Sequence, residues 1–177
     1  YLKDVPESWK PVSILQLMQH SSGIADYRAQ KGFDVSADYR PEQLIETVAA
    51  LPLAFEPGTD VKQSATNFLL LTSIIEKAGK MPYHDFEEKY QIDYLGLRQT
   101  FFGEDMAKEK QADATTTGNV HQTFKKDRDY INPSETTTGY VEKDGRLVAA
   151  PAVSPTALKG FSDIWASAEN VSHWDIG

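Results

Sequence analysis

The sequence predicts a mainly α-helical fold with one small β-hairpin. Apolar residues recur at helical spacing over residues 65–78, and Asp144-Gly145 separates two short apolar pairs, as in a tight hairpin turn. The chain has 177 residues, of which 40% are hydrophobic and 25% are charged. That length and composition suit a globular protein with a core of its own. We therefore expect residues 1–177 to form a single helical domain.

Two helices are expected in the first third of the chain. The segment 13–20 (SILQLMQH) has four apolar residues at helical spacing, and Ser13 is suited to cap its first turn. Gly23 is expected to stop this helix in a left-handed conformation. The segment 41–51 (PEQLIETVAAL) has proline at the first helical position and acids in the first turn. Its predicted buried face consists of Leu44, Ile45, Val48 and Leu51.

The longest predicted helix follows a turn at residues 56–59 (EPGT), where proline and glycine occupy the central positions. This helix covers residues 65–78 and is so apolar that most of it should be buried. Gly79 is expected to end it. A further helix is predicted over residues 83–90.

The second half of the chain is less regular. Residues 103–135 are polar and poor in core-forming side chains, so we expect a long irregular segment with a short helix near residues 105–110. The hairpin is predicted over residues 138–149. A last helix should begin at Ser167, whose hydroxyl can cap the Asn170 amide.

Composition excludes several classes of function. The net charge of −8 argues against nucleic acid or anionic lipid as a main partner. The chain has no cysteine, so a disulfide framework and a cysteine-based zinc site are excluded. No apolar run approaches the roughly 18 residues of a membrane span. The first residues, YLKDVPESW, do not form a signal peptide and are typical of the middle of a longer protein.

No familiar catalytic pattern is present at the level of residue chemistry. None of the four histidines, His20, His84, His121 and His173, has another histidine at metal-ligand spacing, and structural or surface roles are favoured. Neither a Gly-rich phosphate loop nor a Gly-x-Ser-x-Gly elbow occurs. Neither a metal nor an organic cofactor is expected.

Gln63, Ser64 and Ala65 stand immediately before the long apolar helix. The plain interpretation is an ordinary helix start, in which Ser64 or Thr66 caps free amides and Gln63 is exposed. The alternative is that these residues belong to an active site. The sequences around them favour the second interpretation.

Five stretches in order resemble one family, the serine β-lactamases and penicillin-binding proteins, and most closely its class C-type branch. Residues 12–27 (VSILQLMQHSSGIADY) are similar to the family segment ending in His-Thr-Ser-Gly. Residues 55–59 (FEPGT) resemble its Phe-x-Pro-Gly turn, and residues 64–86 resemble the helix after its second catalytic motif. Residues 94–102 (YLGLRQTFF) are similar to Pro-Leu-Gly-Met-x-x-Thr, and residues 160–174 to Gly-x-x-Ser-Thr-Ala-Glu-Asp-Leu. The alternative, an unrelated helical protein, would require five ordered coincidences.

The resemblance implies acyl-enzyme chemistry built on three motifs: Ser-x-x-Lys, Tyr-x-Asn, and Lys-Thr-Gly or His-x-Gly. No serine in this chain is followed by lysine three residues later, and the third motif is also absent. By resemblance the first motif would precede Tyr1 and the third would follow Gly177. We therefore expect the chain to be the central, largely helical portion of a larger enzyme, with the rest of the catalytic domain as its partner.

The second motif falls inside the chain in altered form. The resemblance places Gln63 at the tyrosine position, Ser64 in the middle and Ala65 at the asparagine position. A glutamine amide does not titrate, and alanine has no hydrogen-bonding side chain. Three explanations stay open: catalysis is altered or lost, a shifted register uses neighbouring polar groups, or a tyrosine elsewhere replaces the missing one. The candidates for the last two are Ser64, Thr66, Asn67, Tyr27 and Tyr140.

The expected function is thus that of a β-lactamase-family serine hydrolase fragment, inactive alone, whose parent hydrolyses a β-lactam, an ester or a D-amino-acid peptide. The alternative is a non-catalytic module of the same fold that binds cell-wall peptide or a protein partner. The resemblance implies an exported protein of the periplasm or cell surface, which agrees with the lack of cysteine.

Overall fold

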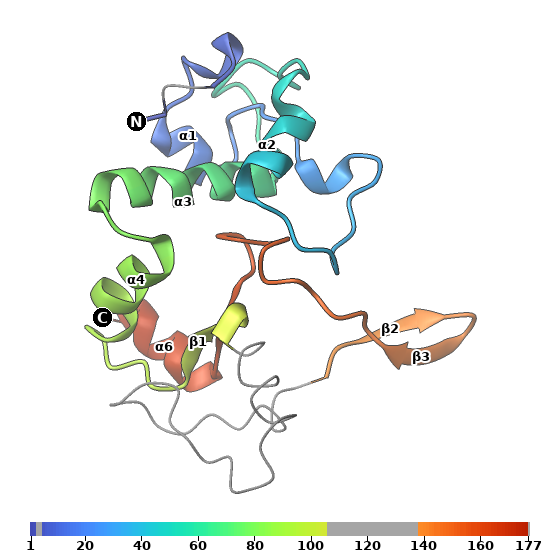
Figure 1. The fold of residues 1–177 in the computed structure, drawn as a ribbon, viewed down its shortest axis with the longest axis vertical. Helices are drawn as coiled ribbons and strands as arrows, with labels where there is room; N and C mark the ends of the chain where they lie inside the picture. The colour runs from blue at the N-terminus through green and yellow to red at the C-terminus, as the bar shows by residue number, and fades with distance from the viewer. Residues whose placement is uncertain (3–4, 106–137, 177) are drawn as a thin grey trace, which may run out of the picture.

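The computed structural model describes residues 1–2, 5–105 and 138–176 (Figure 1). Helices dominate this described part, and two small antiparallel sheets accompany them. In chain order the elements are η1 (Glu7–Trp9), α1 (Ile14–Met18), η2 (Tyr27–Ala29), α2 (Pro41–Ala49), α3 (Ala65–Gly79), α4 (Tyr83–Glu87), η3 (Glu88–Ile92), β1 (Thr100–Phe102), β2 (Tyr140–Lys143), β3 (Arg146–Ala149), β4 (Ile164–Ala166) and α6 (Ala168–Ile176).

Helix α3 organises the first half of the molecule. Helices α1 and α2 lie against one side of it, and α4 follows at its C-terminal end (Figure 1). The first core cluster fills the space between these helices, and the hydrophobic effect of this burial holds them together. Its members are Trp9, Leu17, Ile24, Tyr27, Leu44, Val48, Ala65, Leu69 and Leu70.

A second core cluster lies around α4 and strand β1. It consists of Tyr83, Ile92, Leu97 and Phe102, with Ile164 and Trp174 packed against it. Strand β1 pairs antiparallel with β4, so that Phe101 is opposite Trp165. This small sheet was not predicted from the sequence, because each of its strands has only three residues and neither shows a turn signal to its partner.

The predicted helix limits are largely confirmed. Ser13 caps α1 by accepting the Gln16 amide, and Ser167 accepts the Asn170 amide at the start of α6. Helix α3 extends to Gly79, but the left-handed residue that ends it is Lys80, with φ 53°. The helix predicted over 83–90 is instead one turn of α-helix, α4, followed by the π-helical η3.

Two apolar faces are less buried than predicted. In α1 only Leu17 is buried, while Ile14, Leu15 and Met18 are exposed. In α2, Leu44 and Val48 are buried as predicted, but Leu51 lies beyond the end of the helix and is exposed.

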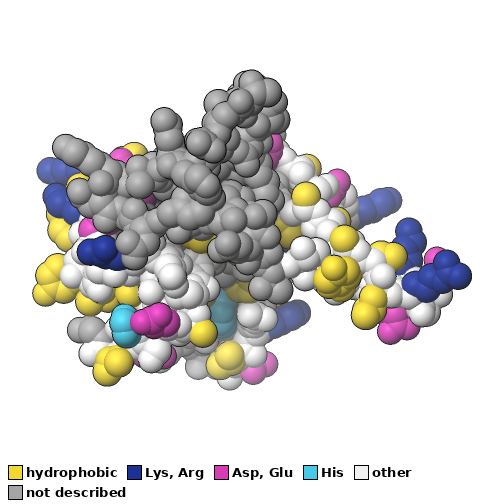
Figure 2. Space-filling view, turned by 90° about the horizontal axis from the view of Figure 1, so that it is seen from below, with side chains coloured by type: hydrophobic (Ala, Val, Ile, Leu, Met, Phe, Trp, Pro, Cys, Tyr) yellow, Lys and Arg dark blue, Asp and Glu magenta, His cyan; other side chains and the backbone are white. Residues whose placement is uncertain are grey.

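The predicted hairpin is confirmed. Strands β2 and β3 pair antiparallel around Asp144 and Gly145, both of which have positive φ, as a two-residue turn of this kind requires. The hairpin projects from the helical body (Figure 1), and a space-filling view shows charged side chains of both signs near its tip (Figure 2). Of the irregular segment predicted over 103–135, residues 106–135 lie outside the described part, as does most of the short helix expected near 105–110.

Candidate functional site

The candidate site is the α3 entry loop, residues 62–64, together with the first turn of α3. Gln63 is exposed, whereas Ser64 and Ala65 are buried. Of the two helix-capping candidates, neither acts as predicted: Ser64 is the N-cap residue, but its side chain makes no capping hydrogen bond. The three residues therefore differ in role, with one side chain facing solvent and two facing the protein interior.

His20 holds the main chain of this loop from the end of α1. The Nδ1 atom of His20 lies 3.2 Å from the Ser64 amide nitrogen, which donates to it. The backbone carbonyl of the same residue accepts from the Lys62 amide at 2.9 Å. The His20 ring also packs against Phe68, with ring centroids 5.2 Å apart. Sequence reasoning gave His20 a structural or surface role, because no spacing rule links a residue after α1 to the start of α3.

Buried hydroxyl and amide groups continue the network behind the loop. The carbonyl of Ala25 accepts from Ser64 Oγ at 3.3 Å and from Thr66 Oγ1 at 2.7 Å. Ser22 Oγ donates to Asn67 Oδ1 at 2.7 Å. These bonds satisfy polar groups that would be costly to bury unpaired. Ser64, Thr66 and Asn67 thus face inward, whereas Lys62 and Gln63 present side chains at the surface of the loop.

Two tyrosines are candidates to replace a missing phenol. Tyr27 is 1% exposed, and its hydroxyl donates to the Ala157 carbonyl at 2.9 Å. Burial, with Asp26 nearby, raises the pKa of Tyr27 well above its usual value, so this phenol stays protonated. Tyr140 begins strand β2 of the projecting hairpin and is exposed. Neither hydroxyl is hydrogen-bonded to the α3 entry loop in this structure.

Arg28 and Phe161 lie beside the first turn of α3, where residues 154–163 pack against it. The Arg28 guanidinium makes a forked contact with Asp26, with Nη2 to Oδ2 at 2.6 Å, and lies 4.3 Å from the centre of the Phe161 ring. The hydrogen bond with Asp26 raises the pKa of Arg28 further, so the side chain is a fixed cation. Phe161 meets Phe68 of α3 edge to face. The segment is thereby packed onto the first half of α3.

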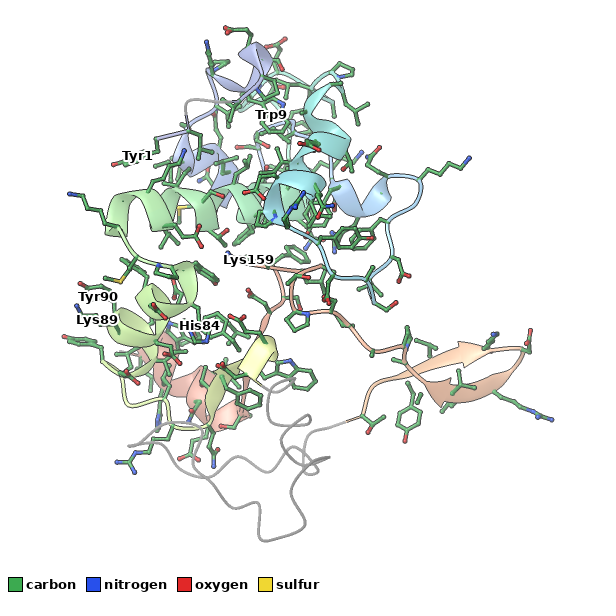
Figure 3. All side chains as sticks on the ribbon, viewed as in Figure 1. Tyr1, Trp9, His84, Lys89, Tyr90 and Lys159 are labelled. Carbon is green, nitrogen blue, oxygen red and sulfur yellow. The ribbon has the colours of Figure 1, made fainter. Side chains whose placement is uncertain are left out.

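A cavity of about 210 Å³ lies between α4, β1 and the 154–163 segment. Lys159 points into this region and bonds Glu76 at 2.9 Å (Figure 3). Burial raises the pKa of Asp163, which also lines the cavity and accepts the Gly160 amide at 2.8 Å. Burial and the neighbouring Asp163 likewise raise the pKa of Glu87. The cavity lining thus includes the carboxylates of Glu76, Glu104 and Asp163, with Lys159 and His84 beside them among uncharged residues.

His84 is surrounded by carboxylates at the edge of the same region. Its Nε2 lies 2.9 Å from Asp105 Oδ2, and its Nδ1 lies 3.8 Å from Glu88 Oε2. One ligand atom from each of these three side chains falls within 4.8 Å of the others. An imidazole with two carboxylates can ligate a divalent cation, but the same residues also serve a structural role, because the His84–Asp105 hydrogen bond joins α4 to the residues after β1.

A second cavity, of about 310 Å³, opens between the N-terminal residues and α3. Tyr1, Trp9, Ile14, Leu70 and Ile74 are among its lining residues, and Figure 3 shows Tyr1 and Trp9 on this side of the molecule. Within the described residues, no helix is both long and apolar enough to cross a membrane.

A family model described as Beta-lactamase matches residues 1–175. The chain belongs to the beta-lactamase family. No curated protein matches this chain.

Solved structures show the same fold. A D-stereospecific amidohydrolase from Streptomyces sp. superposes with a TM-score of 0.68 at 20% identity, over 99% of this chain and 52% of that one. D-amino acid amidase from Ochrobactrum anthropi SV3, complexed with D-phenylalanine, gives 0.66 at 17% identity, over 97% and 45%. The octameric penicillin-binding protein homologue from Pyrococcus abyssi gives 0.63 at 24% identity, over 98% and 35%. This beta-lactamase-family chain spans about half the length of the amidohydrolase.

Proposed function

We propose that the chain is the helical part of an acyl-transferring serine hydrolase, and that it contributes a substrate-facing loop rather than the nucleophile. The α3 entry loop carries this proposal: its backbone is fixed from two sides, while its central side chain, Gln63, faces solvent. Family membership and the 52% coverage of the amidohydrolase support the wider assignment.

Gln63 can take part in substrate binding but not in proton transfer. Its carboxamide offers one acceptor oxygen and two N–H donors, and it does not titrate. An amide group of a substrate can pair with both functions of such a side chain. We therefore favour an amide or peptide of a D-amino acid over a simple ester as the substrate of the whole enzyme, in keeping with the names of the amidohydrolase and the amidase.

The nucleophile and its base lie outside these residues in this proposal. No serine here has lysine three residues later, and the serine of the loop itself, Ser64, is buried with its hydroxyl directed to the Ala25 carbonyl. A serine hydroxyl needs an adjacent base to attack a carbonyl. The parent enzyme would supply the Ser-x-x-Lys pair, and it needs neither a metal ion nor an organic cofactor for this chemistry.

A non-catalytic binding module is the second candidate, favoured by Gln63 and Ala65 at the second-motif positions. This module would bind cell-wall peptide or a protein partner without turning it over. The sequence of the gene on either side of the segment that encodes these 177 residues discriminates between the two candidates. A Ser-x-x-Lys upstream supports the hydrolase, and a disrupted motif there supports the binding module.

A direct assay tests the proposed role of this chain. The 177-residue protein is incubated with nitrocefin, p-nitrophenyl acetate and D-phenylalanine p-nitroanilide, next to the Ser64→Ala variant as a matched control. Equal background rates for both proteins are expected. Turnover by the unmodified chain that is lost in Ser64→Ala would contradict the proposal, because it would place a working nucleophile in the loop.

A further inference from the structure

His20 occupies a position at which helices normally place glycine. Helix α1 ends with the Ser21 amide donating to the Gln16 carbonyl at 2.9 Å and the His20 amide donating to the Leu17 carbonyl at 3.2 Å. This pair of hydrogen bonds forms a Schellman motif, in which the residue after the C-cap, here His20, is left-handed. His20 has φ 56°. For a residue with a Cβ atom, that conformation costs roughly 1–2 kcal/mol.

The imidazole makes contacts that glycine cannot make. Its Nδ1 faces the Ser64 backbone N–H at 3.2 Å and the Asn67 carboxamide nitrogen at 3.4 Å. The Asn67 carboxamide is oriented by Ser22, which donates to its oxygen. Because two donors converge on Nδ1, that atom carries a lone pair and the ring proton resides on Nε2.

The main chain of the same residue holds the other side of the loop. The His20 carbonyl accepts the Lys62 amide at 2.9 Å. One residue therefore fixes the amides on both sides of Gln63, one through its backbone and one through its side chain. Gln63 lies between the two fixed amides with its own side chain exposed.

We propose that His20 is a positioning residue, whose neutral imidazole holds the α3 entry loop so that Gln63 is presented to a ligand. The strained left-handed conformation is retained because it aims the ring at Ser64. That the ligand is an acyl substrate rests on the proposed function. The two hydrogen bonds that His20 accepts from the loop amides, here called the clamp, do not depend on that function. Neither does the imidazole tautomer that they require.

Three substitutions of His20 distinguish the effect of its side-chain acceptor atom from the effect of its strained backbone conformation. His20→Asn tolerates positive φ and keeps an acceptor near the position of Nδ1. His20→Gly tolerates positive φ but has no acceptor. His20→Gln carries its amide one methylene further and disfavours positive φ. Lys80→Gly is the matched control, because Lys80 is also left-handed (φ 53°) and its exposed side chain makes no hydrogen bond to the described residues.

Amide hydrogen exchange of Ser64 and Lys62 in the 177-residue chain measures whether His20 holds the loop. In His20→Gly and His20→Gln the Ser64 amide should exchange about three- to tenfold faster, the factor expected for one lost hydrogen bond, while in His20→Asn it should stay protected. The Lys62 amide bonds to the backbone and should stay protected in all three variants, as should both amides in Lys80→Gly. Unchanged Ser64 exchange in His20→Gly would overturn the proposal, and so would equal acceleration of both amides in His20→Asn, which would indicate simple unfolding.

Two further readouts complete the test. Nitrogen-15 spectra of the imidazole should show an unprotonated Nδ1 and a protonated Nε2; the reverse tautomer would contradict the clamp. Titration with D-phenylalaninamide should then give weaker binding to His20→Gly than to His20→Asn. Failure of the unmodified chain to bind this probe would count against the proposed function, while the exchange pattern would still decide the clamp.

Discussion

The hydroxyl of Tyr27 donates to the backbone carbonyl of Ala157 at 2.9 Å, across 130 residues of sequence. Tyr27 also belongs to the core between α1, α2 and α3. The bond therefore ties the 154–163 segment to the first core cluster, close to the α3 entry loop. Together with the Phe161–Phe68 ring contact and the Lys159–Glu76 bond, it holds the C-terminal part of the described chain over α3.

Removing this hydroxyl should weaken that attachment. Tyr27→Phe is expected to lower the free energy of unfolding by about 1 to 2 kcal/mol, because the ring stays packed while a buried carbonyl loses its donor. Tyr94→Phe, at a residue that is 82% exposed, should change it little. Urea denaturation of the three proteins measures the effect. Equal stability of Tyr27→Phe and the unmodified chain would show that Ala157 needs no donor from Tyr27.

Gly23 lies where a side chain cannot fit. Its φ is 76°, and a Cβ atom there would lie 2.2 Å from the Phe55 carbonyl oxygen. Gly23→Ala should lower the free energy of unfolding by on the order of 3 kcal/mol or more, because it combines a positive φ with a collision against the backbone. Gly32→Ala is the control, because Gly32 has φ 94° but nothing within 4 Å of its Cβ position. Thermal unfolding should rank Gly23→Ala well below Gly32→Ala, and a reversed order would contradict the close approach.

Asp163 should make stability depend on pH. Burial is the main reason that its pKa is raised above the ordinary 3.8. The folded protein therefore binds this proton more tightly than the unfolded chain does, so stability from this group is fully present below about pH 4 and is lost as pH rises through the folded-state pKa. Asp163→Asn should be more stable than the unmodified chain near pH 7, and the difference should shrink toward pH 4.

Asp34 supplies a control of opposite sign. Hydrogen bonds from Ser36 lower the pKa of this exposed carboxyl, so its contribution is present above about pH 4 and disappears as the solution becomes more acidic. Asp34→Asn should thus be slightly less stable than the unmodified chain near pH 7. Thermal melts across this pH range test both variants, and the same slope for both would contradict the assignment of Asp163.

Asn170 joins α6 to the small sheet. Its Oδ1 accepts from the Gln99 amide at 2.8 Å and from Thr100 Oγ1 at 3.1 Å, and the residue is buried. Asn170→Ala should lower the free energy of unfolding by about 2 kcal/mol, because both donors lose this acceptor. Asn170→Asp keeps an oxygen at the same place and should recover part of the loss when measured by chemical denaturation. No recovery would mean that the amide nitrogen, rather than the oxygen, carries the role.

Local sequence patterns predicted the helix caps and the hairpin, because the residues that form each of these features are only a few positions apart. Ser13 and Ser167 were identified as caps, and Asp144-Gly145 as a hairpin turn, because each bond involved joins residues that are close in sequence. The β1–β4 sheet was missed because its pairing joins residues about 64 positions apart, for example Phe101 with Trp165, and no local turn signal links strands so distant in sequence.

Sequence reasoning named candidate positions for the site, but not the contacts that these residues make in the fold. Family resemblance directed attention to Gln63, Ser64 and Ala65, and the residue-level interpretation assigned Ser64 or Thr66 to helix capping. In the fold, His20 bonds the Ser64 amide and the Ala25 carbonyl takes both hydroxyls. A serine before an apolar helix predicts a cap only when no tertiary acceptor competes for its hydroxyl.

The central claim is that this chain contributes the helical wall and the Gln63 loop of a hydrolase whose acylated serine lies elsewhere. Intact-mass spectrometry after incubation with benzylpenicillin and with an activated D-alanine ester tests it most directly. We predict an unchanged mass for the 177-residue chain under both conditions. A stoichiometric adduct that maps to one of its own serines would contradict the claim.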